Sequence, residues 1–194
     1  LEFDYSIQPS VIFSISLPGT PLSGCAEILK SKNYSYDEIT NKDRIIKVRD
    51  LSKDASRLIV DDAHENYLTV NKYQKINQSA LLLARVGNKL KPTIFEFEEQ
   101  PIYIHQNVVA LVPDREKTSI AYLVMSISDA EKSGNFANFY RGSTRPYLTH
   151  ADVLHKIKID LPNLSRQKDE LEKQLLNKIQ SLKAQAEKEK FKHE

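Results

Sequence analysis

Cations and aromatic rings gather in one short stretch of this sequence, YRGSTRPYLT at residues 140–149. It carries two arginines, two tyrosines and several hydroxyl groups, and it contains no acidic residue. Gly142 permits backbone conformations that other residues avoid, so the N–H groups of the Gly-Ser-Thr turn are able to face an anion. Guanidinium and backbone N–H groups are common contacts to phosphate oxygens. The stretch therefore predicts a site for phosphates and base edges.

A second basic segment without acids, ARVGNKLKP at residues 84–92, follows a run of apolar residues. We expect a strand that delivers an arginine to its end, a turn at Gly87 and Asn88, and two lysines on the loop. The candidate contacts to phosphates are Arg85, Lys89, Lys91, Arg141 and Arg145. The candidates for base-edge or sugar contacts are Asn88, Ser143, Thr144 and Tyr147. On these features alone, two ordinary solvated turns remain an alternative.

Catalytic signatures are missing from the rest of the sequence. The five glycines form no dinucleotide-binding, phosphate-loop or nucleophile-elbow motif. The five histidines lack metal-ligand spacing, and the single cysteine, Cys25, excludes an internal disulfide and a cysteine-based zinc site. Acidic stretches at residues 95–100 and 113–117 are interpreted as solvated turns, and the chain has no Pro-Pro turn of the kind used by base-flipping methyltransferases. The motifs therefore predict no catalytic, metal or cofactor site.

Charge is distributed so that no strong global field surrounds the main part of the chain. The 194 residues carry a formal net charge of +2, from 28 Lys and Arg and 26 Asp and Glu. Residues 165–194 hold eight of these cations and six of the anions, which leaves 20 of each in residues 1–164. Any contact with a polyanion must then come from local patches such as the two basic segments. No apolar run approaches the roughly 20 residues of a membrane span, and low cysteine usage fits a cytoplasmic protein.

The elements that must position the basic segments follow from the apolar pattern. Strands are predicted at residues 11–18, 44–51, 80–86, 93–97, 102–112 and 157–162. Helices are predicted at 21–32 with Ser23 as N-cap, within 67–78, from about 117 to Gly134, and in a short piece that packs Phe136 and Phe139. A further short helix after Thr149 has Asp152 as the return half of its capping box. The prediction is an α+β domain over residues 1–163 with a twisted, largely antiparallel sheet.

Residues 164–194 predict one long helix of the coiled-coil type, because no glycine or proline interrupts them. Apolar residues recur at steps of four, four, three and four along this segment. They are Leu171, Leu175, Ile179, Leu182 and Ala186. A narrow apolar stripe between charged residues is typical of a helix that pairs with another helix. The alternative is an amphipathic helix that lies on its own domain.

The order of these motifs, from about Leu22 to the C-terminus, resembles the target recognition domain of type I restriction-modification specificity subunits. The most specific block runs from the Gly-Ser-Thr turn through Pro146, the capped helix and the strand IKIDLPNL to Gln167 in the long helix. The sequence departs from the family at Asn163, where a second proline is common. It also has one recognition domain and one helix, where a full subunit has two of each.

The resemblance implies non-catalytic, sequence-specific recognition of double-stranded DNA in a system of restriction and DNA methylation. The domain would read half of a bipartite site, and the long helix would dock onto methyltransferase (modification) subunits, with restriction subunits as further partners. Either two copies pair through the helix as a homodimer, or the chain is part of a longer protein. That protein would be a complete specificity subunit or a single-chain N6-adenine methyltransferase. A third alternative is a protein-interaction adaptor that acts through the helix and does not bind DNA.

Overall fold

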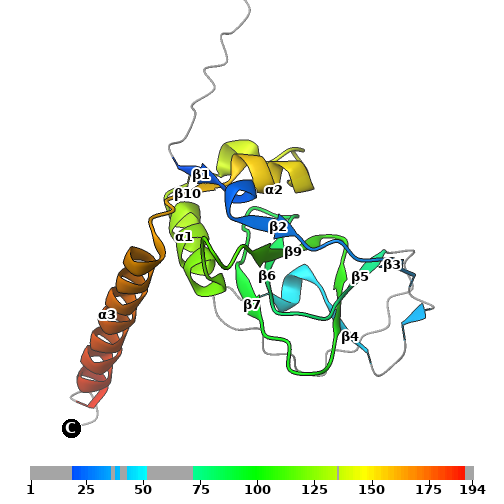
Figure 1. Ribbon diagram of the computed structural model, residues 1–194. Coiled ribbons are helices and arrows are strands. Elements are labelled where there is room, and N and C mark those ends of the chain that lie inside the picture. Colours follow the sequence, from blue (N-terminus) through cyan, green and yellow to red (C-terminus); the bar gives the residue numbers. More distant parts are fainter. Residues whose placement is uncertain (1–18, 36–37, 40–42, 52–71, 135, 191–194) are drawn as a thin grey trace, which may run out of the picture.

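The computed structural model describes residues 19–35, 38–39, 43–51, 72–134 and 136–190, and for 137 and 186–190 it describes the backbone alone. The strand predicted at 11–18 and the first part of the helix predicted within 67–78 lie outside the described residues. The described chain forms two four-stranded sheets, a small two-stranded pair and three α-helices, one of which is long (Figure 1).

The first sheet has the strand order β2 (Ala26–Ile28), β9 (Val108–Pro113), β6 (Ala80–Ala84) and β7 (Thr93–Phe95), and all of its pairs are antiparallel. Its central strand β6 is buried along its whole length. Leu81 and Leu83 enter one hydrophobic core, while Leu82 and Ala84 enter the other. Burial on both faces explains why this strand is a continuous apolar run and does not alternate with polar residues.

The second sheet has the order β3 (Asn33–Tyr34), β5 (Tyr73–Ile76), β8 (Ile102–His105) and β4 (Arg44–Ile46), and only its β4–β8 pair is parallel. The single strand predicted at 102–112 is two strands, β8 and β9, with a turn at Gln106 and Asn107. Polar residues between two apolar runs favour such a turn. Because β8 belongs to one sheet and β9 to the other, this turn joins the two sheets.

Three helices cover the first sheet and its edge. α1 (Ile120–Lys132) begins after Ser119, whose Oγ accepts a hydrogen bond from the backbone N–H of Tyr122 at 3.1 Å. Its apolar face packs in the first core, beside the short 3-10 helix η4 (Ala137–Phe139). α2 (His150–Lys156) lies next to the small pair formed by β1 (Thr20–Pro21) and β10 (Lys158–Ile159) (Figure 1). These predicted helices, and the capping box of Thr149 with Asp152, are confirmed.

The helix predicted at 21–32 is wrong. A 3-10 turn, η1 (Leu22–Gly24), is followed directly by β2, whose residues pair with β9. Apolar residues in this stretch fit a helix or a strand, and the free edge of β9 decides the outcome through long-range pairing. The described part of the helix predicted within 67–78 is also wrong, because Tyr73–Ile76 forms strand β5.

The strand predicted at 44–51 ends early. β4 stops at Ile46, and a 3-10 helix, η3 (Val48–Asp50), follows. The carboxylate of Asp50 accepts a hydrogen bond from the backbone N–H of Lys47 at 2.7 Å, which turns the chain away from the sheet. This turn moves the cations of the segment from a sheet edge onto a loop.

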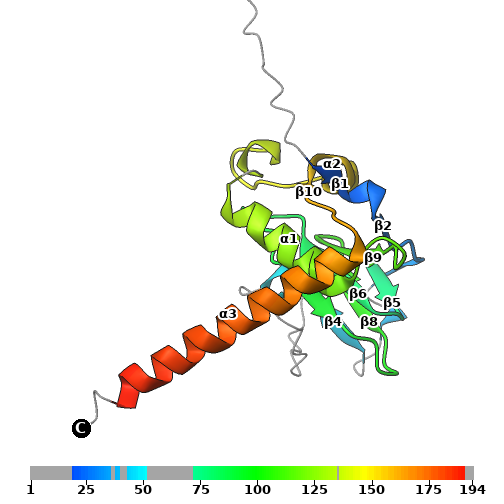
Figure 2. The same ribbon diagram turned by 60° about the vertical axis from the view of Figure 1, so that its left-hand side comes forward.

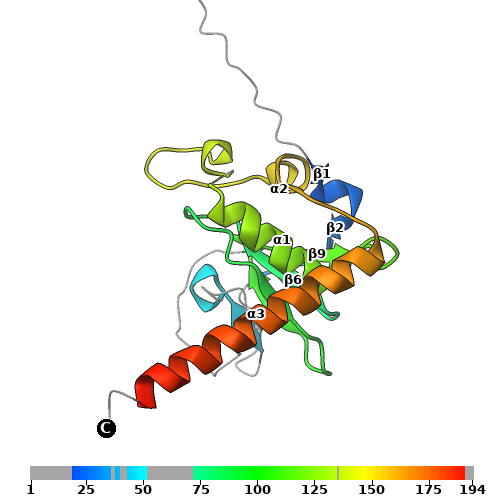
Figure 3. The same ribbon diagram turned by 90° about the vertical axis from the view of Figure 1, so that its left-hand side faces the viewer.

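The long helix predicted at the C-terminus is confirmed as α3 (Leu164–Lys190), which has 27 residues. Its start lies beside α1, and the rest runs away from the domain (Figure 2 and Figure 3). The side chain of Gln167 is buried, donates to the backbone oxygens of Lys117 and Pro162, and accepts from the hydroxyl of Thr118. A hydrogen bond of 3.0 Å from the hydroxyl of Tyr122 to Glu170 connects the start of α3 to α1 itself.

Candidate nucleic-acid interface

The two basic segments predicted from the sequence lie side by side in the structure. The backbone N–H of Gly87 donates to the oxygen of Pro146 at 2.9 Å, and the N–H of Leu148 donates to the oxygen of Arg85 at 2.8 Å. Gly87 has the positive φ expected of its turn, at 100°. The segment after β6 and the stretch 140–149 therefore form one continuous structure.

The tip of the second segment is a closed loop, here called the 142–146 loop. Arg141 and Tyr147 close it by exchanging backbone hydrogen bonds in both directions at 2.9 Å. Gly142 has φ of 83°, and a Cβ atom there would lie 3.3 Å from the oxygen of Arg145. A side chain at this position would be strained on both counts, so the glycine is required for the shape of the loop.

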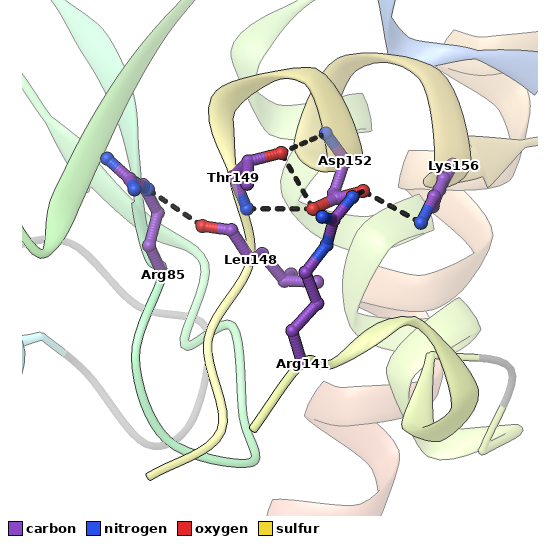
Figure 4. Close-up of polar contacts among 6 residues, drawn as sticks. All are labelled: Arg85, Arg141, Leu148, Thr149, Asp152 and Lys156. Atoms are coloured by element: carbon purple, nitrogen blue, oxygen red, sulfur yellow. Dashed lines mark hydrogen bonds and ion pairs between the residues drawn. The ribbon is translucent and has the colours of Figure 1, made fainter.

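The guanidinium group of Arg85 connects this loop to the turn between β8 and β9. Nε donates to the oxygen of Leu148 at 3.0 Å (Figure 4). Nη1 donates to the oxygen of Gln106 at 3.2 Å. Nη1 also lies 2.8 Å from Nε2 of His150, which must be neutral to accept. Burial lowers the pKa of Arg85, and burial together with the charge of Arg85 lowers the pKa of His150.

Arg141 binds the other side of the loop to α2. Its Nη2 lies 3.1 Å from Oδ1 of Asp152, a carboxylate that is 2% exposed, and Nζ of Lys156 lies 2.8 Å from the same oxygen (Figure 4). The backbone and hydroxyl of Thr149 donate to the other carboxylate oxygen at 2.9 and 2.7 Å. Burial alone would raise the pKa of Asp152, but the hydrogen bonds from Lys156, Thr149 and Arg141 hold it well below its usual range.

The other predicted contact residues divide into two groups. Lys91 is half-buried, and its Nζ donates to the oxygen of Val48 at 3.0 Å, so it holds η3 in place. The remaining members are exposed at the surface. They are Asn88, Lys89, Ser143, Thr144, Arg145 and Tyr147.

A groove of about 530 Å³ opens between η3, the turn after β6, the β8–β9 turn and the 142–146 loop. We call it the basic groove. It is lined by Lys47, Val48, Arg49, Val86, Gly87, His105, Asn107, Thr144, Arg145 and Pro146. None of these described lining residues is acidic, although Asp50 stands beside the groove with an oxygen 3.6 Å from Nε of Arg49. The groove thus concentrates positive charge from two separate parts of the chain.

Four polar lining residues were missed in the sequence: Lys47, Arg49, His105 and Asn107. The two cations lay in a segment predicted to be a strand, although three cations within residues 44–49 were a usable signal. His105 ends β8, and Asn107 lies in the unrecognised turn between β8 and β9. Burial lowers the pKa of His105, and the charges of Lys47 and Arg145 lower it further.

The described residues offer little other chemistry. They contain no group of three His, Cys, Asp or Glu side chains arranged to hold a metal ion. Cys25 is buried, and its burial raises the pKa of the thiol. Among the described helices, none is long and apolar enough to cross a membrane.

Comparisons with known proteins found matches to the structure and none to the sequence. No protein-family model and no curated protein matches this chain. One match is a chain from a structural study of complex assembly and conformational transition in a type I R-M system. It covers 92% of this chain with a TM-score of 0.60 and 14% identity. The HsdS subunit from Thermoanaerobacter tengcongensis matches 92% with a TM-score of 0.58 and 13% identity. The type I restriction-modification S subunit from M. genitalium matches 80% with a TM-score of 0.52 and 8% identity.

These matches establish the fold. The predicted α+β architecture with antiparallel sheets and a long C-terminal helix is confirmed, and solved chains of type I restriction-modification systems share it. The chain spans 43%, 42% and 37% of the lengths of these three solved chains, in the order given above.

Proposed function

We propose that this chain is a DNA target recognition domain of a type I restriction-modification specificity subunit, and that it binds duplex DNA through the basic groove. The observation that carries the proposal is the gathering of Lys47, Arg49 and Arg145 around one groove on a domain of neutral overall charge. Local positive charge without acidic lining favours a polyanion. The shared fold with solved S subunits supports the same assignment.

Within this proposal the residues of the two segments and the groove have different roles. The groove cations and the exposed Lys89 contact phosphates, which provides affinity without sequence information. Asn88, Ser143, Thr144 and Tyr147 stand beside them and contact base edges or sugars. Arg85, Arg141 and Lys91 bind carbonyl oxygens and a carboxylate of the protein itself, and they hold the contacting loops in position.

The experiment that tests the proposal is duplex DNA binding as a function of salt concentration. Arg145→Ala and Lys47→Ala should each remove one phosphate interaction and so lower the slope of log K against log salt by about 0.9. Lys168→Ala is the matched control, because this exposed lysine on α3 also carries one charge but lies outside the groove. Equal slopes for the groove variants and the control would exclude the groove as the DNA site.

The long helix supports a second part of the proposal, docking onto another helix. At about 1.5 Å per residue, its 27 residues span about 40 Å. Leu175 and Leu182 are more than half exposed, and Leu176 and Ile179 lie beside them on the same exposed part. Leu171 is half-buried, and the side chain of Ala186 lies outside the described residues. We propose that this stripe pairs with methyltransferase subunits or with the α3 helix of a second copy, and that catalysis is supplied by the partners.

Light scattering on the intact chain tests this docking. If two copies pair, replacing Leu175 and Ile179 together by serine should convert a dimer into a monomer, because serine side chains cannot form the apolar interface. Replacing the exposed Lys173 and Lys178 by serine is the control and should leave the mass unchanged. A monomer in every case excludes self-pairing and leaves the methyltransferase subunits as the partner. If the wild-type chain also fails to bind duplex DNA, the adaptor function becomes the better assignment.

A further inference from the structure

A single histidine stands at the junction of the two sheets and lines the basic groove. His105 is the last residue of β8, immediately before the turn that joins β8 to β9. Its ring meets the ring of Tyr73 edge to face, with centroids 5.8 Å apart and planes at 71°. The backbone N–H of Asn107 donates a hydrogen bond to Nδ1 of His105 at 3.1 Å. The ring is therefore held on two sides.

The hydrogen bond from Asn107 decides which ring nitrogen carries the proton. A backbone N–H is always a donor, so Nδ1 must keep its lone pair in order to accept. The neutral ring then carries its single proton on Nε2. A second proton on Nδ1 would face the N–H of Asn107, and it would also add charge beside Lys47 and Arg145, which already lower the pKa of this group after burial. At neutral pH, His105 is thus an uncharged ring with one donor, at Nε2.

The turn that fixes this donor is itself rigidly held. Arg85 binds it twice, because its backbone N–H donates to the oxygen of Asn107 at 2.8 Å and its Nη1 donates to the oxygen of Gln106 at 3.2 Å. A donor on a strand end, followed by two residues whose carbonyls are both engaged, has a defined position. Such preorganisation is what base readout requires, whereas a phosphate contact tolerates a mobile side chain.

We infer that His105 reads a guanine base in the major groove by donating its Nε2–H to N7 or O6. The inference rests on the proposed function and names the base that the same groove selects. Guanine presents two acceptors, N7 and O6, on its major-groove edge and no donor. Adenine offers one acceptor beside its N6 donor, and thymine offers one acceptor beside its methyl group, so guanine is the best match for a group that only donates. Cytosine presents its N4 amino donor there and would face Nε2–H with no acceptor. The cations of the groove hold the neighbouring phosphates and do not discriminate between bases.

Selection of bound duplexes from a random library, with the intact chain, identifies the base at each position of the preferred site. The wild-type protein should select guanine at one position that His105→Ala no longer specifies. His105→Gln should move the preference at that position toward adenine, because a glutamine amide pairs with N6 and N7 of adenine. Arg145→Ala should weaken binding to all sequences while the selected bases stay the same.

A second measurement changes the DNA and compares its effect on the wild-type protein and on His105→Ala. Replacing the selected guanine by 7-deazaguanine removes the N7 acceptor, and replacing it by adenine removes the O6 acceptor. At least one replacement should weaken wild-type binding roughly 5- to 30-fold, the range expected for losing one good base interaction. The same replacement should have no effect on His105→Ala, because its donor is already gone.

The outcomes separate the inference from the proposal beneath it. If the wild-type chain does not bind duplex DNA, the proposed function fails. If it binds with groove-dependent salt slopes, but His105→Ala selects the same bases and loses the same affinity on both replacements, DNA recognition stands and the role of His105 is overturned. Loss of the guanine preference together with insensitivity of His105→Ala to the replacements supports the inference.

Discussion

Arg141 stands at the base of the 142–146 loop and Arg145 lies within it, yet the structure uses the two arginines differently. Arg141 stands at the base of the loop, where it pairs with a buried carboxylate on α2. Arg145 is exposed at the tip and lines the basic groove. The two arginines differ because a buried Asp152 left unpaired would lower stability, whereas an exposed cation without a partner lowers it little. Equal residue types in one loop are thus separated into a clamp and a contact surface.

The same division extends to the neighbouring segment. Arg85 and Lys91 bind backbone oxygens of other loops, while Lys89 between them is exposed. We call the interactions of Arg85, Arg141 and Asp152 the loop clamp. In both segments, the cations that hold the loops are thus distinct from the cations that are exposed. Mutations should separate the two classes, through stability for the loop clamp and through DNA affinity for the groove.

The largest expected effect is that of Asp152→Ala. This change removes the capping box of α2 and leaves Arg141 and Lys156 without their shared partner. Loss of a cap costs about 1 kcal/mol, and loss of buried charge-assisted hydrogen bonds adds about 1.5–3 kcal/mol, so unfolding should become easier by about 2–4 kcal/mol. Urea denaturation measures the change. The matched control, Asp169→Ala on the exposed face of α3, should stay within about 0.5 kcal/mol of wild type.

Arg85→Ala should have the next largest effect on stability. The variant leaves the oxygens of Leu148 and Gln106 without their guanidinium donor, which we expect to cost about 1–3 kcal/mol. Lys89→Ala, on the same segment but exposed, should leave the free energy of unfolding nearly unchanged. Thermal unfolding of both variants tests this contrast. Equal stability of the two proteins would remove Arg85 from the loop clamp.

Arg141→Ala and Arg145→Ala test the comparison within a single loop. We expect Arg141→Ala to lower stability by about 1 kcal/mol, a reduced value because the arginine side chain is half exposed and Lys156 still pairs with Asp152. Arg145→Ala should leave stability unchanged and reduce the salt slope of DNA binding by about 0.9. Parallel denaturation and binding curves measure both quantities. The distinction between clamp and groove fails if the two variants have the same profile.

The smallest expected effect is on the pH dependence of stability. The folded protein lowers the pKa of His150 from its ordinary value of 6.5, so the unfolded chain takes up a proton first as the pH falls. The Arg85–His150 interaction therefore contributes fully above about pH 6.5 and is lost progressively below it. Because His150 is exposed, solvent screening should limit the loss to a few tenths of a kcal/mol.

Melting temperatures at pH 7.5 and 5.5 measure this effect. The fall on acidification should be smaller in His150→Gln than in wild type, since glutamine keeps an acceptor and does not titrate. His155→Gln, an exposed position on the same helix, serves as the control and should behave as wild type. An identical fall in all three proteins would contradict a neutral His150 in the loop clamp.

Local signals in the sequence predicted much of the fold. The cap at Thr149, the helical segment of α1, the apolar run of β6 and the uninterrupted α3 each depend on residues near in sequence. β2 was mistaken for a helix because its conformation is set by pairing with β9, more than 80 residues later. A pattern within one segment contains no information about such a partner.

The candidate site was predicted only in part, again because a local sequence pattern does not reveal long-range partners. Both basic segments were recognised, but the sequence did not indicate which cations bind the protein itself. The partner of Arg141 was recognised only as a helix cap, and the partners of Arg85 are backbone oxygens that every residue has. Lys47 and Arg49 enter the groove because Asp50 bends the chain after β4, a change that a strand pattern conceals.

The buried amide of Gln167 at the root of α3 has a geometric consequence. With Glu170 it fixes the direction in which a helix of 27 residues leaves the domain. Over about 40 Å, a tilt of only about 5° at the root displaces the far end by about 3 Å, more than half of one helical turn. A few hydrogen bonds at the base of α3 thus determine how precisely the far end of the helix is positioned for anything assembled on it.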